Sequence, residues 1–209
     1  MIVYKIIDHP LVKDKLTRMR KKETVSTVFR TNLEELTQLM VYEATKDLTL
    51  KNILIDTPVT NEAVGFKLKN KICLVPILRA GIGMVDGVKR LIPTATIGHI
   101  GLYRNEETLQ PIEYFKKFPQ NINESDVIIL DPMLATGGSV IAAANIIKKH
   151  NPKSIKFICI VASPEGIKNV QDAHPDVDIY AGSLDEKLND QGYIVPGLGD
   201  AGDRIFGTK

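Results

Sequence analysis

The residues best suited to chemistry form one short segment, in which an acidic side chain is followed by a turn of small residues. The turn contains Gly137 and Gly138, flanked by the hydroxyl side chains of Thr136 and Ser139. Such a turn lets successive backbone N–H groups converge on an anion, and the helical pattern beyond it adds the positive end of a helix dipole. Asp131 precedes the turn and can accept hydrogen bonds from vicinal ribose hydroxyls. The segment therefore predicts a site for a sugar phosphate.

Other interpretations of the same segment are weaker. The simplest is a plain strand-to-helix turn in which Ser139 caps the helix. A nucleotide-binding loop of the Walker type would need Gly-Lys-Ser or Gly-Lys-Thr after its spacer, and a dinucleotide fingerprint would need Gly-x-Gly-x-x-Gly. Neither pattern is present in this segment. The carboxylate at the end of the strand is the feature that favours a sugar phosphate over a plain turn.

The rest of the sequence predicts an α/β fold that holds this segment at the end of a buried strand. Helix-like spacing of apolar residues predicts helices over residues 9–22 and 24–48, and residues 51–60 are predicted to be extended. From residue 71, short β-branched runs alternate with helical patterns, which predicts a doubly wound, mostly parallel sheet. The predicted strands are 71–77, 96–103, 126–130, 154–162 and 177–181, and the predicted helices are 82–91, 138–150 and 165–173.

This fold also places three other segments near the carboxyl edge of the sheet, where open α/β sheets bind their ligands. Arg79 follows an apolar strand and precedes small residues, and its guanidinium fork suits pyrophosphate oxygens. Residues 104–118 carry charges at a turn and alternate beyond it, which predicts a protruding hairpin. The Gly-rich tail from residue 189 predicts a loop that folds back over the edge.

Composition excludes several classes of protein. A length of 209 residues, with 44% hydrophobic and 25% charged residues, predicts one globular α/β core with a modest appendage. A net charge of +2 gives no field for nucleic acid or an anionic membrane, and no segment approaches the about 20 apolar residues that span a bilayer. Cys73 and Cys159 lie in apolar runs, which predicts buried, reduced thiols in a cytoplasmic protein. No His or Cys stands at metal-ligand spacing, so no protein metal ligand is predicted.

Four segments carry a resemblance to a known family. Residues 131–139, Asp-Pro-Met-Leu-Ala-Thr-Gly-Gly-Ser, resemble the phosphoribosyl-pyrophosphate loop of type I phosphoribosyltransferases, in the form that the uracil phosphoribosyltransferase branch has. Most type I members have a second acidic residue where this chain has Pro132. Residues 75–81 resemble the second phosphate loop of that branch, residues 101–108 its flexible flap, and residues 194–204 its uracil-binding tail. The resemblance spans essentially the whole chain in the right order.

The resemblance implies a transferase, specifically a pentosyltransferase of pyrimidine salvage, which moves the 5-phosphoribosyl group from phosphoribosyl pyrophosphate to uracil and gives UMP and pyrophosphate. It implies one domain over residues 1–209, with a core at about 71–182, a flexible β-hairpin flap, and a base-binding hood made by the N-terminal segment and residues 183–209. It also implies Mg²⁺ held mainly through substrate pyrophosphate and water, and GTP as an effector on which these residues carry no information. The long apolar N-terminal region predicts a homodimer or larger homo-oligomer.

The resemblance also assigns roles to individual residues. The catalytic residues are Asp131, Arg104 and Asp200. The residues that bind phosphoribosyl pyrophosphate are Arg79, Arg104, Asp131, Pro132, Met133, Leu134, Ala135, Thr136, Gly137, Gly138, Ser139 and Asp200. The residues that bind uracil are Ile194, Gly199, Asp200 and Ala201. Backbone N–H and C=O groups of a Gly-rich loop can complement the ring N–H and two carbonyls of uracil, whereas cytosine would leave buried groups unpaired.

Two alternatives stay open at this point. An RNA-binding regulator of a pyrimidine operon can be built on the same fold, but the near-neutral charge and the lack of a basic stripe disfavour it. A phosphoribosyltransferase for another base would share the phosphate loops, and only the C-terminal tail opposes that interpretation. Without the resemblance, the tail would be interpreted as a turn with Asx hydrogen bonds.

Overall fold

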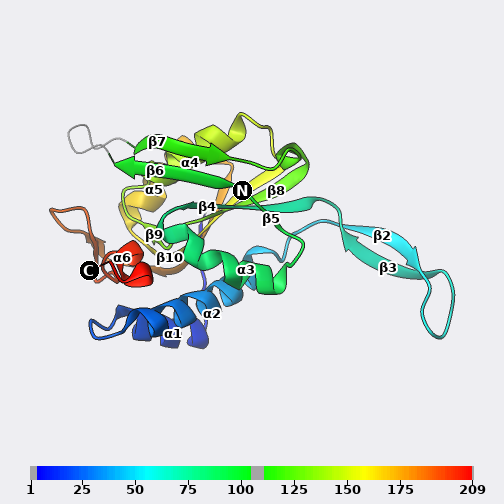
Figure 1. Cartoon of the computed structure of the whole chain (residues 1–209), viewed down its shortest axis with the longest axis horizontal. Helices are drawn as coiled ribbons and strands as arrows, with labels where there is room; N and C mark the ends of the chain where they lie inside the picture. Colours follow the sequence, from blue (N-terminus) through cyan, green and yellow to red (C-terminus); the bar gives the residue numbers. More distant parts are fainter. Residues whose placement is uncertain (1–3, 105–110, 209) are drawn as a thin grey trace.

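A mostly parallel sheet forms the centre of the protein in the computed structural model, which describes residues 4–104 and 111–208 (Figure 1). The strands follow the order β1-β11-β10-β8-β4-β6-β7, and neighbours are parallel except for the antiparallel pair β6–β7. The short strands β5 and β9 pair with β4 and β10. The bounds are β1 (Tyr4–Ile6), β4 (Lys71–Leu78), β5 (Thr96–Ile97), β6 (His99–Arg104), β7 (Pro111–Lys117), β8 (Ser125–Leu130), β9 (Met133–Leu134), β10 (Ser154–Ala162) and β11 (Val177–Leu184).

Helices cover both faces of this sheet, so the predicted doubly wound α/β class is confirmed. They are α1 (Pro10–Arg20), α2 (Ser26–Ala44), the 3₁₀ turn η1 (Ala80–Met84), α3 (Val85–Leu91), α4 (Gly138–Lys148), α5 (Pro164–Ala173) and α6 (Ala201–Phe206), with a further 3₁₀ turn η2 (Ile122–Glu124) before β8. Apolar residues of α1, α2, α3 and α6 form one core cluster, and those of α4 and α5 form a second.

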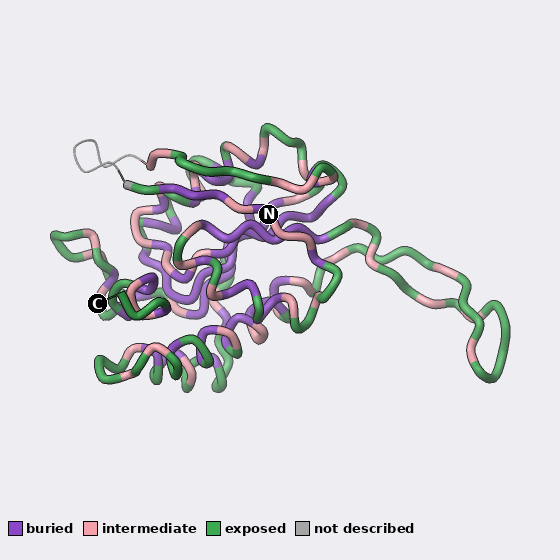
Figure 2. The backbone as a smooth tube through the Cα atoms, in the orientation of Figure 1, coloured by how far each residue is buried: buried purple, intermediate pink, exposed green. Residues whose placement is uncertain are grey.

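The central strands are buried because each supplies side chains to both clusters. In β8, Ile128 and Leu130 point into the first cluster, whereas Val127 and Ile129 point into the second, as the alternation of a strand requires. Figure 2 shows this strand as buried along its length. The apolar run therefore ends at the carboxyl edge, where Asp131 begins the predicted phosphate-binding segment.

The two cysteines confirm their prediction. Both Cys73 and Cys159 are free and buried. Burial raises the pKa of the Cys73 and Cys159 thiols, which keeps them protonated.

Three predicted elements differ from the structure, and one strand was not predicted. The unpredicted strand is Tyr4–Ile6, which pairs with β11 at the edge of the sheet, in a stretch too short for periodicity to show. The predicted helix 82–91 begins with the tighter turn η1, and the predicted strand 96–103 is divided into β5 and β6. The tail is not only loop, because it contains β12 (Lys187–Leu188), β13 (Ile194–Val195) and α6.

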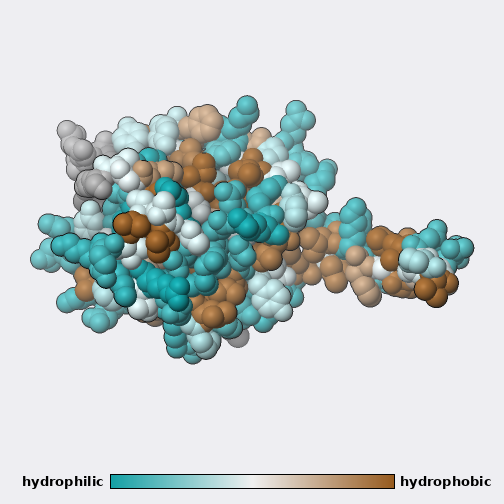
Figure 3. Space-filling model, turned by 60° about the horizontal axis from the view of Figure 1, so that its bottom comes forward, coloured by the Kyte–Doolittle hydropathy of each residue, from teal (hydrophilic) through white to brown (hydrophobic). Residues whose placement is uncertain are grey.

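A two-stranded antiparallel arm projects from the body of the protein (Figure 1). It consists of β2 (Leu50–Ile55), which lies in the predicted extended segment, and β3 (Ala63–Leu68), which the sequence analysis did not predict. Apolar side chains are exposed along it, and Figure 3 shows them gathered on the projecting part. The exposed ones are Leu50, Leu54, Ile55, Val59, Val64 and Phe66. In the described parts of the chain, no helix has the length and apolar character needed to cross a membrane.

Candidate active site

The predicted phosphate-binding turn forms the lining of a cavity of about 220 Å³, made by Asp131 and residues 133–140. Gly137 is the N-cap of α4 and has a left-handed backbone, with φ of 85° and ψ of −9°. A left-handed residue followed by a right-handed one turns successive N–H groups to the same side, which is an anion-binding nest. The N-cap residue is Gly137, which has no side chain, so the interpretation of Ser139 as the cap is wrong. Ser139 instead lies in the first turn with an exposed position.

Helix α5 and the residue before it hold the opposite side of this turn. The hydroxyl of Ser163 donates to the carbonyl oxygen of Ala135 at 2.6 Å, and the amide of Asn169 donates to the carbonyl oxygen of Thr136 at 3.0 Å. Pro132 is buried behind the cavity, where its carbonyl oxygen accepts the N–H groups of two β10 residues at 2.9 and 3.1 Å. Because the carbonyl groups of the turn are used on this side, its N–H groups are available to the cavity.

Asp131 is a partly buried carboxyl at the edge of this cavity. Burial raises its pKa to about 7, and the nearby Asp200 carboxylate adds to the increase, while the N–H of Met133, which donates to Oδ1 at 3.1 Å, opposes it. The tail and the phosphate-binding turn lie beside one another, since Met133 and Asp200 line one cavity. A carboxyl that titrates near neutral pH in a cavity is a candidate for function.

Arg79 directly follows β4 and lies against the tail. Its Nη2 donates to Oδ1 of Asp203 at 3.2 Å, and its guanidinium lies 5.9 Å from the centre of the Phe206 ring. The Arg79 side chain is 56% exposed, and such exposed ion pairs contribute little to stability. The guanidinium can therefore exchange this partner for an anionic ligand at low cost.

The tail completes a second cavity, of about 330 Å³, that joins three of the four predicted segments. Its lining includes Ala80 from the turn after Arg79, Met133 from the phosphate-binding segment, and Gly199–Gly202 from the tail. Asp200 is the N-cap of α6 and accepts the N–H of Asp203 at 2.9 Å. This cap is the physical reason that the Gly-rich tail forms a helix rather than a loop.

Comparison with known proteins identifies the family of this chain. A profile of the uracil phosphoribosyltransferase family matches residues 6–208. A uracil phosphoribosyltransferase of Ureaplasma urealyticum serovar 10 is 80% identical over 207 residues, which cover 99% of this chain and 100% of the relative. The chain belongs to the uracil phosphoribosyltransferase family.

Solved structures show that the fold is shared as well. A structure from Aquifex aeolicus is 40% identical to this uracil phosphoribosyltransferase family member, with a TM-score of 0.93 over 98% of each chain. An adenine phosphoribosyl transferase from Trypanosoma brucei is 13% identical, with a TM-score of 0.59 over 90% of this chain and 87% of that one. The second likeness shows the fold alone, and it is the predicted type I phosphoribosyltransferase fold.

Most predicted site residues of this family member lie together, with two exceptions. The side chain of Ile194 is buried in the first core cluster and lies beneath the tail rather than in the lining of the second cavity. Arg104 is the last residue of β6, but its side chain and residues 105–110 of the predicted flap lie outside the described residues. Pro111, where the hairpin resumes, lies beside the phosphate-binding turn, with its Cδ 3.9 Å from an ideal Cβ on Gly138.

Sequence reasoning missed several residues that shape this site. Tyr193 lines the second cavity and stands next to a predicted uracil-binding residue, so its position in the chain could have indicated it. Asp185 directly follows β11, as Asp131 directly follows β8, and that shared pattern was a signal. Ser163 and Asn169 hold the turn through its backbone carbonyl groups, and this long-range contact leaves no signal in the sequence.

Proposed function

We propose that this chain transfers the 5-phosphoribosyl group of phosphoribosyl pyrophosphate to uracil, giving UMP and pyrophosphate in pyrimidine salvage. The observation that carries the proposal is the cavity that brings the tail, Met133 and Ala80 together beside the anion-binding turn. A sugar phosphate on the turn and a base on the tail would then be neighbours. Membership of the uracil phosphoribosyltransferase family supports the same pair of substrates.

Each described group has a physical task in this proposal. The N–H groups of the turn and the hydroxyl groups of Thr136 and Ser139 bind the 5′-phosphate, and ionised Asp131 accepts the ribose hydroxyls. Arg79 binds the pyrophosphate, and the family resemblance adds Arg104, whose side chain lies outside the described residues. The backbone of Ile194 and of Gly199–Ala201 recognises uracil, because a base held by paired backbone groups is distinguished from one that leaves them unpaired.

The reaction breaks the bond between ribose C1 and pyrophosphate while the attacking ring nitrogen of uracil forms the new bond. Positive charge develops on the sugar, as it does in glycoside cleavage. The protein lowers this barrier by holding the base in line with C1 and by stabilising the departing pyrophosphate. Asp200, at the mouth of the base cavity, is placed to influence the attacking nitrogen or the ribose.

Mg²⁺ fits this site as a substrate-bound ion. The Asp131 carboxyl in the cavity lining is a hard oxygen donor that such an ion could meet, and the described residues hold no group of three or more His, Cys, Asp or Glu suited to a metal. The ion would be held mainly through substrate pyrophosphate and water. When bound, Mg²⁺ would neutralise phosphate oxygens of the donor and its leaving group.

The direct test mixes purified protein with Mg²⁺, labelled uracil and phosphoribosyl pyrophosphate. Labelled UMP should form, and Asp131→Asn should lose turnover while its circular dichroism stays that of the wild type. Hypoxanthine, orotate and cytosine in the same assay should compete poorly. Failure to form UMP, or equal competition by another base, contradicts the proposed substrate. Binding of pyrimidine-operon leader RNA in a filter assay would instead favour the regulator.

The proposal includes a homo-oligomer, but for a different reason from the one the sequence offered. Most apolar positions of α1 and α2 pack inside the chain, and Leu11, Val28 and Tyr42 are the larger ones that stay exposed. The exposed apolar side chains of the β2–β3 arm are the better candidate, since projecting apolar surfaces mark protein contacts. Light scattering should give more than the monomer mass, and Phe66→Asp should lower it. A monomer mass for the wild type at micromolar concentration contradicts this.

Four further parts of the proposal rest on the family resemblance alone. They are GTP as an effector, a cytoplasmic location, a mobile flap, and one domain with a hood of the N-terminal segment and residues 183–209. Initial rates measured with and without GTP at subsaturating phosphoribosyl pyrophosphate test the effector. An unchanged rate would remove GTP from the proposal.

A further inference from the structure

A buried ion pair lies directly behind the tail. Arg20, the last residue of α1, donates from Nη1 to Oδ2 of Asp185 at 2.7 Å and from Nη2 to Oδ1 at 2.6 Å. Asp185 is only 5% exposed and also accepts the hydroxyl of Ser183 at 2.8 Å. Burial alone would raise the pKa of Asp185, but the hydrogen bonds from Arg20, Ser183 and Gly197 keep it below its ordinary value. Asp185 is therefore held as a carboxylate and joined to Arg20 in the planar, two-bond geometry that fixes orientation.

This ion pair holds both backbone groups of Gly197. Nη1 of Arg20 donates to the carbonyl oxygen of Gly197 at 2.7 Å, and the Gly197 N–H donates to Oδ2 of Asp185 at 2.9 Å. Gly197 has a φ of 61°, and an ideal Cβ there would lie 2.1 Å from the carbonyl oxygen of Ile194. The chain thus makes a tight turn at Gly197 in an orientation set from outside, two residues before Gly199.

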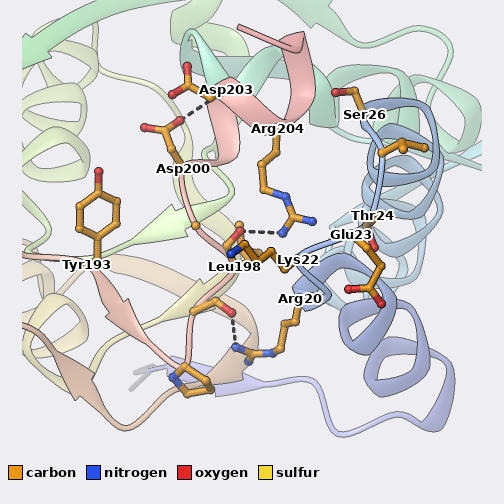
Figure 4. A pocket seen from close by; sticks show the side chains of 14 residues that line it. Arg20, Lys22, Glu23, Thr24, Ser26, Tyr193, Leu198, Asp200, Asp203 and Arg204 are labelled. Carbon is orange, nitrogen blue, oxygen red and sulfur yellow. Dashed lines mark hydrogen bonds between the residues drawn. The ribbon is translucent and has the colours of Figure 1, made fainter. Parts of the chain in front are cut away.

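A second arginine holds the next carbonyl group in the same direction. Nη1 of Arg204 donates to the carbonyl oxygen of Leu198 at 2.8 Å, and its guanidinium also binds the carbonyl oxygens of Met19 and Lys21 at the end of α1. Figure 4 shows the two arginines reaching the tail from the same side. Two consecutive carbonyl groups therefore point toward α1, which leaves the backbone from Gly199 onward to face the cavity that Ala80 and Met133 line.

The arginine side of the tail is open rather than packed. A cavity of about 750 Å³ lies there, lined by the α1–α2 connection and by Gly197–Asp200 (Figure 4). Only the side chain of Leu198 enters the core among these tail residues. Since Leu198 supplies the packing contact here, the hydrogen bonds from Arg20, Asp185 and Arg204 to the backbone of Gly197 and Leu198 are the polar contacts that orient this loop.

We propose that the Arg20–Asp185 pair is a positioning pair that sets the affinity and selectivity for the base without touching it. The inference rests on the proposed recognition of uracil by residues 199–201. Backbone groups that recognise a base must match its edge closely, and a displacement of about 1 Å can cost about 100-fold in rate. Phosphate binding should not depend on the Arg20–Asp185 pair, because Ser163 and Asn169 hold the phosphate-binding turn on the other face of the sheet.

The test compares a ligand that has the base with one that lacks it. Arg20→Lys keeps the charge but loses the planar fork, and Asp185→Asn keeps the shape but places an amide in the network. Calorimetry should show UMP binding weakened by about 10-fold or more in both variants, with ribose 5-phosphate changed by less than about twofold. In turnover, KM for uracil should rise while KM for phosphoribosyl pyrophosphate stays constant, and discrimination against cytosine should fall.

Lys156→Gln is the matched control. Lys156 is a buried cation that binds Asp47 and, at 2.7 Å, the carbonyl oxygen of Ala44, away from the tail. This variant should lower the melting temperature but leave both affinities unchanged. The inference is overturned if Arg20→Lys weakens the binding of UMP and of ribose 5-phosphate equally, or weakens neither. If Asp185→Asn does not fold, the result for Arg20→Lys decides. If wild-type protein binds UMP no more tightly than ribose 5-phosphate, the proposed uracil site itself is wrong.

Discussion

Replacing Gly137 by alanine tests whether the left-handed residue of the phosphate-binding turn is what shapes the site. Gly137 has a φ of 85°, which an L-residue adopts at a cost of about 1–2 kcal/mol. An added Cβ would also lie 3.0 Å from Cγ2 of Val170 and 3.1 Å from the carbonyl oxygen of Gly166. Such crowding in a packed region costs about 1 kcal/mol or more, so Gly137→Ala should lose about 2–4 kcal/mol of unfolding free energy.

The neighbouring glycine provides the control. Gly138 is the first residue of α4 and has no positive φ, and an ideal Cβ there would have only ordinary contacts at 3.9 Å. Alanine is favoured over glycine in a helix by up to about 1 kcal/mol, so Gly138→Ala should be neutral or stabilising without ligand. Both variants add one methyl group, at adjacent residues. Gly137→Ala should lower the free energy of unfolding, whereas Gly138→Ala should leave it unchanged or raise it.

Calorimetric melting of both variants checks these values. For a protein of this size, about 2–4 °C is lost per kcal/mol, so Gly137→Ala should melt about 4–16 °C lower. If alanine leaves the left-handed region, the nest opens and ribose 5-phosphate should bind about 10-fold to 100-fold more weakly. Equal melting temperatures for the two variants, with unchanged ribose 5-phosphate affinity in Gly137→Ala, would refute this account of the turn.

Three further predictions follow from other parts of the structure. Because burial raises the pKa of Asp131 to about 7, its protonated form is favoured by folding. Between about pH 4 and pH 7 the wild type should lose up to about 4 kcal/mol of unfolding free energy relative to Asp131→Asn, and parallel urea-unfolding curves at every pH would count against the raised pKa. Arg79→Lys should raise KM for phosphoribosyl pyrophosphate about 10-fold or more through loss of the guanidinium fork, with KM for uracil unaffected; initial-rate measurements that show both constants unchanged would remove Arg79 from the pyrophosphate site. Phe157→Ala should lose about 3–5 kcal/mol in urea unfolding because Phe157 is fully buried in β10, and a loss below about 1 kcal/mol would contradict that packing.

The sequence was most informative where one pattern decided one element. The apolar run of β8 and the small-residue turn after Asp131 predicted a buried strand, a tight turn and a helix, and the structure has all three, with Gly137 left-handed at the turn. The tail was harder, because its glycines hid a helix that depends on the Asp200 cap. A Gly-rich sequence indicates that the backbone is conformationally free, but it does not indicate which capping side chain will fix that backbone in a helix.

Long-range partners were beyond the reach of sequence patterns. Arg20 and Asp185 are 165 positions apart, and nothing near either residue in the chain indicates the other. In the β2–β3 arm only β3 was missed, since its large apolar side chains Val64 and Phe66 lie on the exposed face and do not mark a strand packed on a core. Both features depend on the assembled fold rather than on local preference.

The central sheet divides most of the packing beneath the two proposed ligands. Leu134, Val140 and Val170 pack beneath the sugar-phosphate turn in one cluster, whereas Leu198 and Ile205 anchor the base-facing tail in the other, against which Met133 and Ala135 of the turn also pack. Under the proposed function, substitutions at Leu198 or Ile205 should therefore alter base preference more than the binding of the sugar donor. A new acceptor would then require repacking mainly on one side of the molecule.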